Sequence, residues 1–202
     1  MKLIAVTDDR QSVRDLASKI IGLIERIDFV QIREKTKTAH EIITLLQYME
    51  EGGVDKDKII LNDRLDIALL MGIQRVHLPE KGLPVKMVKQ NFPQIRVGRS
   101  VHSYEGAKKA ERDGADYCLY GHCFETYSKK GKNPNGIQPI LKIKEELRIP
   151  VYAIGGITLN KIDTLQQVKA DGIAVMSGIF FAEDPFFSTK KYYEAIKHES
   201  KI

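Results

Sequence analysis

Tryptophan is absent from the 202 residues, and aromatic side chains make up only 7% of them. Few platforms are therefore available on which the bases of a single-stranded nucleic acid could stack. The two cysteines, Cys118 and Cys123, lie five residues apart near a predicted strand, where an odd spacing directs side chains to opposite faces. This spacing excludes a disulfide between them and matches neither a CxxC redox motif nor a zinc pattern. We therefore expect a reducing, cytoplasmic location.

Long apolar runs are also missing, since none reaches the roughly 18 residues that a membrane helix needs. The first residues include Asp8 and Asp9, and such early acids are not typical of a signal or transit peptide. No contact with a membrane is expected. The sequence has no GxxxxGK[ST], GxSxG or HExxH motif, which excludes P-loop, α/β-hydrolase and zincin active sites.

The charge balance favours anionic partners. The chain has 32 Lys and Arg against 27 Asp and Glu, giving a net charge of +5. A phosphorylated metabolite fits this surplus as well as a nucleic acid does. Nothing resembles a helix-turn-helix, a zinc finger or an RNA-binding sheet, so a nucleic acid is not expected as the partner.

Short apolar runs alternate with amphipathic stretches along the whole chain, which is typical of strands that are covered on both faces by helices. Strands are predicted at Leu3–Thr7, Phe29–Arg33, Lys58–Leu61, Arg75–Leu78, Arg96–Val101, Asp116–Tyr120, Val151–Ile154 and Gly172–Met176. Helices are predicted at Val13–Ile27, Thr38–Glu50, 64–71, 84–91, 104–113, 136–147, 159–169 and 185–198. Eight such units predict a single α/β domain over residues 1–202, a (β/α)₈ TIM barrel; a doubly wound open sheet is the alternative.

One long polar segment, residues 126–136, follows the sixth predicted strand and contains Lys129, Lys130 and Lys132. Long loops in compact domains are usually functional or disordered. We interpret this segment as a lid at the mouth of the barrel, with a solvated run of charges as the alternative.

The functional site of such a barrel is built at the carboxyl ends of its strands. Gly155 and Gly156 follow the seventh strand, and Ser177 and Gly178 follow the eighth. Backbone N–H groups at these two places commonly hold a phosphate, and glycine lets the backbone approach it closely. An extra helical turn is expected within residues 180–185. The alternative is that the glycines only turn the chain.

Other polar residues follow the second to sixth strands. Arg33 and Lys35 could bind an anion or form a surface salt bridge with Glu34 or another acid. Asn62 and Asp63 could polarise a ring nitrogen or hold a hard cation.

Three histidines, His77, His102 and His122, lie near the ends of consecutive strands and could form a zinc site. No His-x-His pair supports that site. His122 follows Gly121 and opens the polar segment, so it is the best placed to exchange a proton with a ligand.

Several motifs agree in order and spacing with one family. They are Gln31-Ile32-Arg33-Glu34-Lys35, the run from Leu61 to Leu69 beginning Leu61-Asn62-Asp63-Arg64, Val76-His77-Leu78, Gly98-Arg99-Ser100-Val101-His102-Ser103 and Ala153-Ile154-Gly155-Gly156-Ile157. On these residues the chain resembles the thiamine phosphate synthase superfamily over nearly its whole length. The resemblance implies a (β/α)₈ barrel that binds a thiazole phosphate at the loops after strands seven and eight.

Two departures from the synthase pattern bear on the activity. Synthases typically have prolines at the positions of His122 and Glu125, and an aspartate that helps to hold magnesium at the position of Gly82. Loss of that carboxylate weakens the case for diphosphate ionisation, and a gained histidine favours proton transfer. In these features the chain resembles the TenI-type thiazole tautomerases of the superfamily.

This resemblance implies an isomerase that converts a carboxy-thiazolylidene ethyl phosphate into its aromatic carboxythiazole tautomer, with His122 transferring the proton. The residues implied in substrate binding are Arg33, Lys35, Asn62, Ser100, Thr126 and Lys129, with the phosphate on Gly155, Gly156, Ser177 and Gly178. No cofactor or metal is expected, and a homo-oligomer is left open. The alternatives are a thiamine phosphate synthase with an unusual metal site and a non-catalytic ligand-sensing or regulatory protein on the same barrel.

Overall fold

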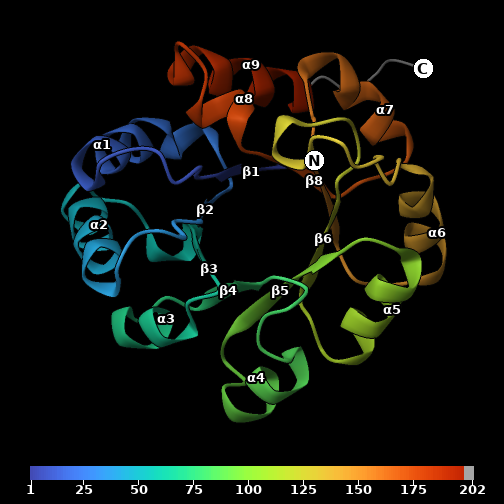
Figure 1. The fold of residues 1–202 in the computed structure, drawn as a ribbon, viewed down its shortest axis with the longest axis horizontal. Coiled ribbons are helices and arrows are strands. Elements are labelled where there is room, and N and C mark those ends of the chain that lie inside the picture. Colours follow the sequence, from blue (N-terminus) through green and yellow to red (C-terminus); the bar gives the residue numbers. More distant parts are fainter. Residues whose placement is uncertain (198–202) are drawn as a thin grey trace.

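The structure is a computed structural model that describes residues 1–197, apart from the side chain of Ser128. Its core is a closed barrel of eight parallel strands in the order β1 to β8 (Figure 1). The strands are β1 (Lys2–Val6), β2 (Phe29–Ile32), β3 (Ile59–Asn62), β4 (Arg75–Leu78), β5 (Arg96–Val101), β6 (Tyr117–Gly121), β7 (Val151–Ile154) and β8 (Gly172–Val175). The predicted (β/α)₈ TIM barrel is confirmed, and each strand boundary lies within one residue of its prediction. The open sheet is excluded because β1 pairs with β8, with Lys2 opposite Gly172.

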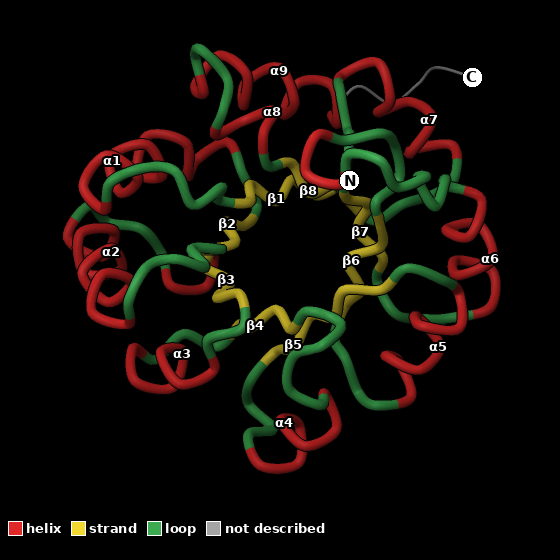
Figure 2. Tube along the Cα trace, in the orientation of Figure 1, coloured by secondary structure: helices red, strands yellow, loops and turns green. Residues whose placement is uncertain are grey.

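Helices surround the barrel as a single outer ring (Figure 2). They are α1 (Val13–Leu23), α2 (Ala39–Glu51), α3 (Leu65–Met71), α4 (Val85–Asn91), α5 (Tyr104–Arg112), α6 (Gln138–Glu146), α7 (Ile162–Gln167), α8 (Ser177–Phe180) and α9 (Pro185–Lys197). The helix predicted over Val13–Ile27 ends as an α-helix at Leu23 and continues as a 3-10 turn, Ile24–Arg26. None of the helices in residues 1–197 is long and apolar enough to cross a membrane.

Buried side chains form two cores. The larger lies between the barrel and the helices, and the smaller fills the barrel interior with residues that include Ile4, Ile60, Leu119 and Tyr152. Alternation along each strand produces this division, because successive side chains point to opposite faces.

The extra helical turn was predicted in the wrong place. It is α8, which begins at Ser177 directly after β8, and not a segment within residues 180–185. Asp184 precedes Pro185, and the residue before a proline is disfavoured in helical conformation. The Asp184 carboxylate instead accepts a hydrogen bond of 2.9 Å from the backbone N–H of Phe187 at the start of α9.

The prediction that the two cysteines face opposite sides of the sheet is also wrong. Both are free, and both belong to the core between the barrel and the helices. Strand β6 ends at Gly121, so the alternation that the prediction assumed does not extend to Cys123. Burial raises the pKa of each thiol to about 12, which leaves both uncharged at neutral pH.

Candidate active site at the carboxyl ends of the strands

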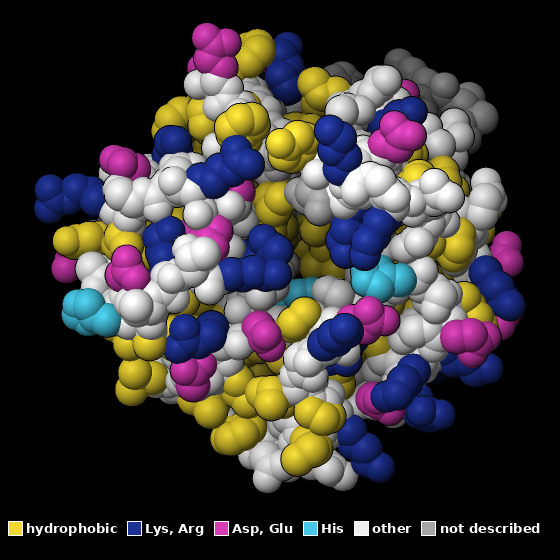
Figure 3. Space-filling model, viewed as in Figure 1, with side chains coloured by type: hydrophobic (Ala, Val, Ile, Leu, Met, Phe, Trp, Pro, Cys, Tyr) yellow, Lys and Arg dark blue, Asp and Glu magenta, His cyan; other side chains and the backbone are white. Residues whose placement is uncertain are grey.

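The carboxyl ends of the strands face the viewer in Figure 1, where β1 to β8 follow one another counterclockwise, as right-handed βα units require. Figure 3 shows the same face with a hollow at the centre of the barrel. Lys and Arg side chains lie on its rim, with histidine at its edge. Asp and Glu side chains lie near the rim as well, so the Lys and Arg side chains offer local contacts to an anionic ligand and not a uniformly positive lining.

Two of the predicted anion-binding residues are free of intramolecular partners. Arg33 is half-buried just after β2 and Lys35 is exposed two residues later. Within residues 1–197 neither side chain forms an ion pair or a hydrogen bond. The alternative of a salt bridge with Glu34 is wrong, because Glu34 pairs with Lys37. Both cations remain available to a ligand.

The pair that involves Glu34 is buried and holds two loops together. The Glu34 side chain is 0% exposed, and its carboxylate lies 2.5 Å from Nζ of Lys37. The same carboxylate accepts a hydrogen bond from the backbone N–H of Asp9, whose own carboxylate lies 3.7 Å from Lys37. The loop that carries Arg33 and Lys35 is thereby fixed to the loop after β1.

The loops after β7 and β8 offer unpaired donors. The backbone N–H groups of Gly156, Ser177 and Gly178 donate no hydrogen bond to any other residue of the described chain. Ser177 and Gly178 also form the first turn of α8, where backbone N–H groups have no partner within the helix. Free amides at these two adjacent loops are what a phosphate site needs.

The two glycines after β7 are required sterically as well. Gly155 has φ +99°, and a Cβ there would lie 2.4 Å from Cβ of His122. Gly156 has φ +66°, and a Cβ there would lie 2.2 Å from the carbonyl oxygen of Glu125. Both glycines turn the chain at positive φ, and both lie too close to neighbouring atoms to carry a side chain. The two interpretations made from the sequence, a close approach of the backbone and a turn of the chain, are therefore compatible.

Polar side chains inside the barrel lie below the hollow in two hydrogen-bonded pairs. Gln31 donates from Nε2 to Oδ1 of Asn62 at 3.0 Å. Nε2 of His77 and Oγ of Ser100 are 2.7 Å apart. Oε1 of Gln31 and Nδ1 of His77 are buried without a partner. Buried polar atoms without a partner are rare in native proteins, so Gln31 has a free acceptor to offer to a ligand.

His77 is neutral at physiological pH. Burial, and to a smaller extent the positive charge of Arg99, lowers the pKa of His77 to about 3. At pH values below 6.5, the ordinary pKa of histidine, the unfolded chain therefore takes up a proton at His77 that the folded chain does not. The contribution of His77 to the free energy of unfolding is complete above pH 6.5 and decreases as the pH drops from 6.5 towards 3.

Between pH 6.5 and pH 5.5 the wild type is expected to lose about 1 kcal/mol of unfolding free energy through His77. The His77→Gln variant should lack this contribution, because glutamine does not titrate. Urea unfolding of both proteins at the two pH values measures the difference, since all other titrating groups are common to them. Equal losses in the two proteins would contradict the assignment of a neutral, buried His77.

His122 contacts the segment that we interpret as a lid. Its side chain is buried, the residue being 9% exposed, and Nε2 lies 3.2 Å from the backbone oxygen of Lys132. The backbone oxygen of His122 also accepts a hydrogen bond from the N–H of Asn135. In the same segment Thr126 is half-buried and Lys129 is exposed. The structure therefore brings His122, Gly155 and the segment 126–136 together.

The three histidines do not form a metal centre. His77 bonds to Ser100, His122 faces Lys132, and Nε2 of His102 lies 3.8 Å from Oε2 of Glu80. Among residues 1–197 no group of three His, Cys, Asp or Glu side chains could hold a metal ion. The zinc alternative has no support in the structure.

A magnesium site of the synthase type does not fit the residues present. A Cβ built on Gly82 would lie 2.8 Å from Oδ1 of Asp63 and 2.8 Å from Cδ of Pro79. Gly82 therefore stands beside Asp63 but supplies no carboxylate, and the proline ring occupies part of the space that a second carboxylate would need. One carboxylate alone is a weak site for a hard cation.

Sequence reasoning missed the loop after β1. Oδ1 of Asp8 and Oε1 of Gln11 are buried and have no partner in the described chain. Nε2 of Gln11 donates to the backbone oxygen of Phe180 at 3.4 Å, which places this glutamine beside α8. The sequence did contain a signal for this loop, because Asp8 lies shortly after β1 as Asp63 lies after β3.

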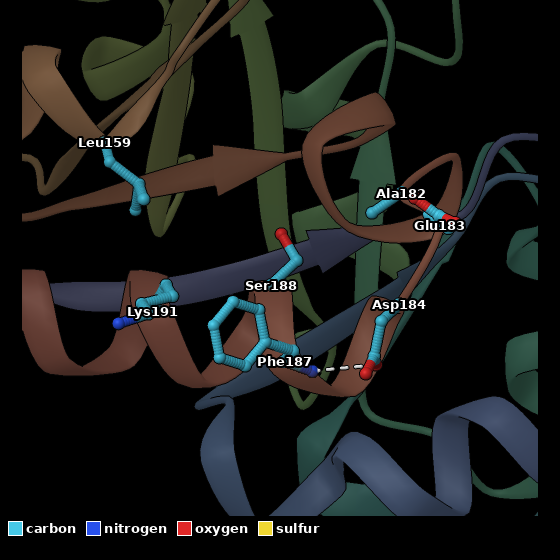
Figure 4. A pocket seen from close by; sticks show the side chains of 7 residues that line it. All are labelled: Leu159, Ala182, Glu183, Asp184, Phe187, Ser188 and Lys191. Atoms are coloured by element: carbon cyan, nitrogen blue, oxygen red, sulfur yellow. Dashed lines mark hydrogen bonds between the residues drawn. The ribbon is translucent and has the colours of Figure 1, made fainter.

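A cavity of about 460 Å³ lies outside the hollow (Figure 4). It is lined by residues before and within α9, among them Asp184, Phe187 and Lys191, and by Leu159. Two carboxylates, those of Glu183 and Asp184, border it. Their charge makes this cavity a poor site for a phosphate, so the loops after β7 and β8 remain the better candidate.

Comparison with known proteins places this architecture in a family. Residues 3–179 match the family model described as thiamine monophosphate synthase. The chain belongs to the thiamine monophosphate synthase family. It is 37% identical over 190 residues to the thiamine-phosphate synthase of Clostridium tetani, covering 90% of this chain and 89% of that protein. It is 39% identical over 189 residues to the thiamine-phosphate synthase of Chlorobium luteolum, with 91% and 87% covered.

A solved structure of this family agrees with the fold. The thiamine phosphate pyrophosphorylase of Pyrococcus furiosus has a TM-score of 0.82 and 30% identity, covering 97% of this chain and 95% of that one. The superfamily resemblance is therefore confirmed. The expected isomerase is contradicted, because the curated relatives are named as synthases, which are transferases. The alternative of a thiamine phosphate synthase agrees better with these names.

Proposed function

We propose that the protein is a thiamine-phosphate synthase, which joins a thiazole phosphate to an aminopyrimidine methyl diphosphate. The observation that carries the proposal is family membership over residues 3–179, with relatives of that name at 37% and 39% identity. The open mouth with unpaired cations and unpaired backbone amides supports it, because both reactants are phosphorylated.

Each reactant has a plausible set of partners. The thiazole phosphate would accept hydrogen bonds from the free N–H groups of Gly156, Ser177 and Gly178, next to Gly155. The diphosphate would lie against Arg33 and Lys35, whose side chains have no partner among the described residues, and Lys129 could approach from the segment 126–136.

The pyrimidine would be recognised inside the barrel. The free Oε1 of Gln31 can accept a hydrogen bond from its amino group, beside Asn62 and Ser100. A pyrimidine bound in this way would have its methylene carbon between the thiazole and the diphosphate. Positioning of two reactants in this way contributes much of the rate in a bimolecular reaction.

The reaction forms one bond and breaks one bond. The ring nitrogen of the thiazole supplies the electron pair for the new bond to the methylene carbon. The bond between that carbon and the diphosphate oxygen breaks, and the diphosphate leaves with its electron pair. Charge on this leaving group would be stabilised by Arg33 and Lys35, so no proton has to be transferred for the bond change.

His122 has a positioning role in this proposal. Its contact with the backbone of Lys132 would hold the segment 126–136 over the reactants. The proton-transfer role belonged to the isomerase expectation and is withdrawn with it. We assign no step to a metal ion, because Gly82 leaves Asp63 without the second carboxylate.

The proposal is tested by incubating the purified protein with both reactants and measuring thiamine phosphate by its fluorescence after oxidation to a thiochrome. Parallel reactions contain magnesium or a chelator, which shows whether the incomplete carboxylate set changes the metal requirement. Turnover that depends on enzyme concentration is the expected result. Absence of product under both conditions, while the thiazole phosphate still binds, would overturn the synthase proposal and leave the phosphate site intact.

Replacing Arg33 by methionine is expected to lower kcat/KM for the pyrimidine diphosphate by about 100-fold, because a charge-assisted contact to the leaving group is lost. The Arg148→Met variant is the matched control, since Arg148 is exposed and has no side-chain partner in the described structure. Steady-state kinetics of both variants measure the effect. Equal values for the two would contradict a role of Arg33 in binding the diphosphate.

A further inference from the structure

A second recess, of about 180 Å³, lies at the opposite end of the barrel from the mouth. Lys2, Phe29, Arg75, Arg96 and Tyr117 border it, and each is the first residue of its strand. We call this recess the basal pocket. The inner core that includes Ile4, Ile60 and Leu119 fills the barrel above it. The basal pocket is therefore separate from the candidate active site.

Three positively charged side chains border the basal pocket. Nζ of Lys2 and the guanidinium carbon of Arg75 each lie 4.9 Å from the centre of the Phe29 ring, so two like charges flank one ring. Arg96 adds a third. Across residues 1–197 no carboxylate oxygen lies within 4.0 Å of the charged nitrogens of these three side chains. Three cationic side chains that border one recess leave a local positive surplus, which a bound anion would neutralise.

The nearby acids are engaged elsewhere. Asp116 borders the basal pocket, but its carboxylate accepts hydrogen bonds from Nζ of Lys89 at 3.0 Å and from the N–H of Val97 at 2.7 Å. Asp28 accepts a hydrogen bond from the N–H of Leu3. Asp116 is paired with Lys89, and Asp28 is not part of the pocket lining, so the three bordering cations outnumber the bordering acids.

A neutral donor is also unused. Tyr117 is 7% exposed, borders the basal pocket, and has a buried hydroxyl without a hydrogen-bond partner. Its ring packs edge-on against Tyr152, with ring centres 5.4 Å apart. Buried tyrosine hydroxyls usually find a partner. This hydroxyl lies against Gly98 of β5, where an added Cβ would be 2.4 Å from its oxygen, so it is not counted among the groups that contact the anion.

We propose that the basal pocket binds a small oxyanion, namely inorganic phosphate or the phosphate group of a compact phosphate monoester. The volume is well below the roughly 300 Å³ of ordinary ligand pockets, which excludes a nucleotide. The cations lie around one recess and not along a stripe, which disfavours a nucleic-acid backbone. Lys2 and Arg96 contact the anion from the rim, and Arg75 contacts it from the half-buried wall.

The test compares two double variants with the same loss of charge. Lys2→Gln/Arg96→Gln removes both rim cations of the basal pocket. Lys86→Gln/Arg148→Gln removes one exposed lysine and one exposed arginine that have no side-chain partner in the described part of the chain. All four positions avoid the candidate active site, so thiamine-phosphate synthase activity serves as a check on folding in both variants if the proposed function holds.

Calorimetric titration with inorganic phosphate should show a site that is at least about tenfold weaker in the basal variant and unchanged in the control. Crystals soaked in selenate should show an anomalous peak between Lys2, Arg75 and Arg96. Equal phosphate affinity in the two variants, or a selenate peak only at the loops after β7 and β8, would overturn the proposal. Tighter binding of a short single-stranded oligonucleotide than of phosphate, lost in the basal variant, would also overturn it in favour of a nucleic-acid surface.

Discussion

Replacing Lys37 by methionine is expected to lower the free energy of unfolding by about 3–5 kcal/mol, the usual effect of leaving one partner of a buried ion pair alone. The Glu34 side chain is 0% exposed and would lose the one ion-pair partner that it has among residues 1–197, with the carboxylate of Asp9 close by. Urea unfolding at pH 7 measures the loss. The loop with Arg33 should also lose its fixed position. We therefore expect kcat to fall in addition to a rise in KM for the thiazole phosphate, so that kcat/KM falls by a larger factor than KM rises.

Two comparisons separate this effect from a general loss of lysine. The Glu34→Gln/Lys37→Met double variant removes both charges and should recover much of the lost stability, because the Glu34 charge is no longer buried without a partner. The Asp9 carboxylate keeps its hydrogen bonds from Thr36. Lys190→Met removes an exposed lysine, whose Nζ lies 3.8 Å from Glu194, and should change stability by less than about 1 kcal/mol. A Lys37→Met variant as stable as Lys190→Met would show that the buried pair contributes little.

Replacing Gly156 by alanine is expected to cost about 2–5 kcal/mol of stability. The left-handed conformation at φ +66° costs an L-residue roughly 1–2 kcal/mol. The new methyl group would also lie 2.2 Å from the backbone oxygen of Glu125 and 2.7 Å from that of Phe124, and such overpacking typically costs about 1–3 kcal/mol more. Displacement of the free N–H should weaken thiazole phosphate binding by about 100-fold, which calorimetry would measure.

Gly53 provides the matched control for this substitution. It has φ +80°, and a Cβ there would meet no atom within 4 Å. Gly53→Ala should therefore show only the conformational cost, about 1–2 kcal/mol, with unchanged binding. If Gly156→Ala cost no more than Gly53→Ala and bound the thiazole phosphate normally, the close approach of the two loops would not matter for the site.

Much of the fold could be predicted because strands and helices leave periodic apolar patterns in the sequence. Val13–Ile27 was predicted as one helix from its apolar spacing, and only its last turn differs. The position of α8 could not be obtained in this way, since four residues are too few to show a period. Its location depends on the loop that joins β8 to Pro185.

The site was predictable to the extent that barrels place functional residues at the ends of strands. Gly156, Ser177 and Arg33 follow from that rule, and the structure leaves their N–H groups or side chain unpaired. The pairing of Glu34 with Lys37 could not be read from the sequence, because Arg33 and Lys35 are closer to Glu34 along the chain than Lys37 is. Gln11 was missed because its contact with Phe180 joins residues that are far apart in sequence.

The pairing of β1 with β8 has a consequence for how the chain is made. Leu3 pairs with Ile173, so β1 keeps one unsatisfied edge until β8 has been synthesised. Exposed strand edges are templates for intermolecular association. Pausing of translation before residue 172 should therefore leave nascent chains that depend on chaperones, whereas completed chains no longer present an open edge.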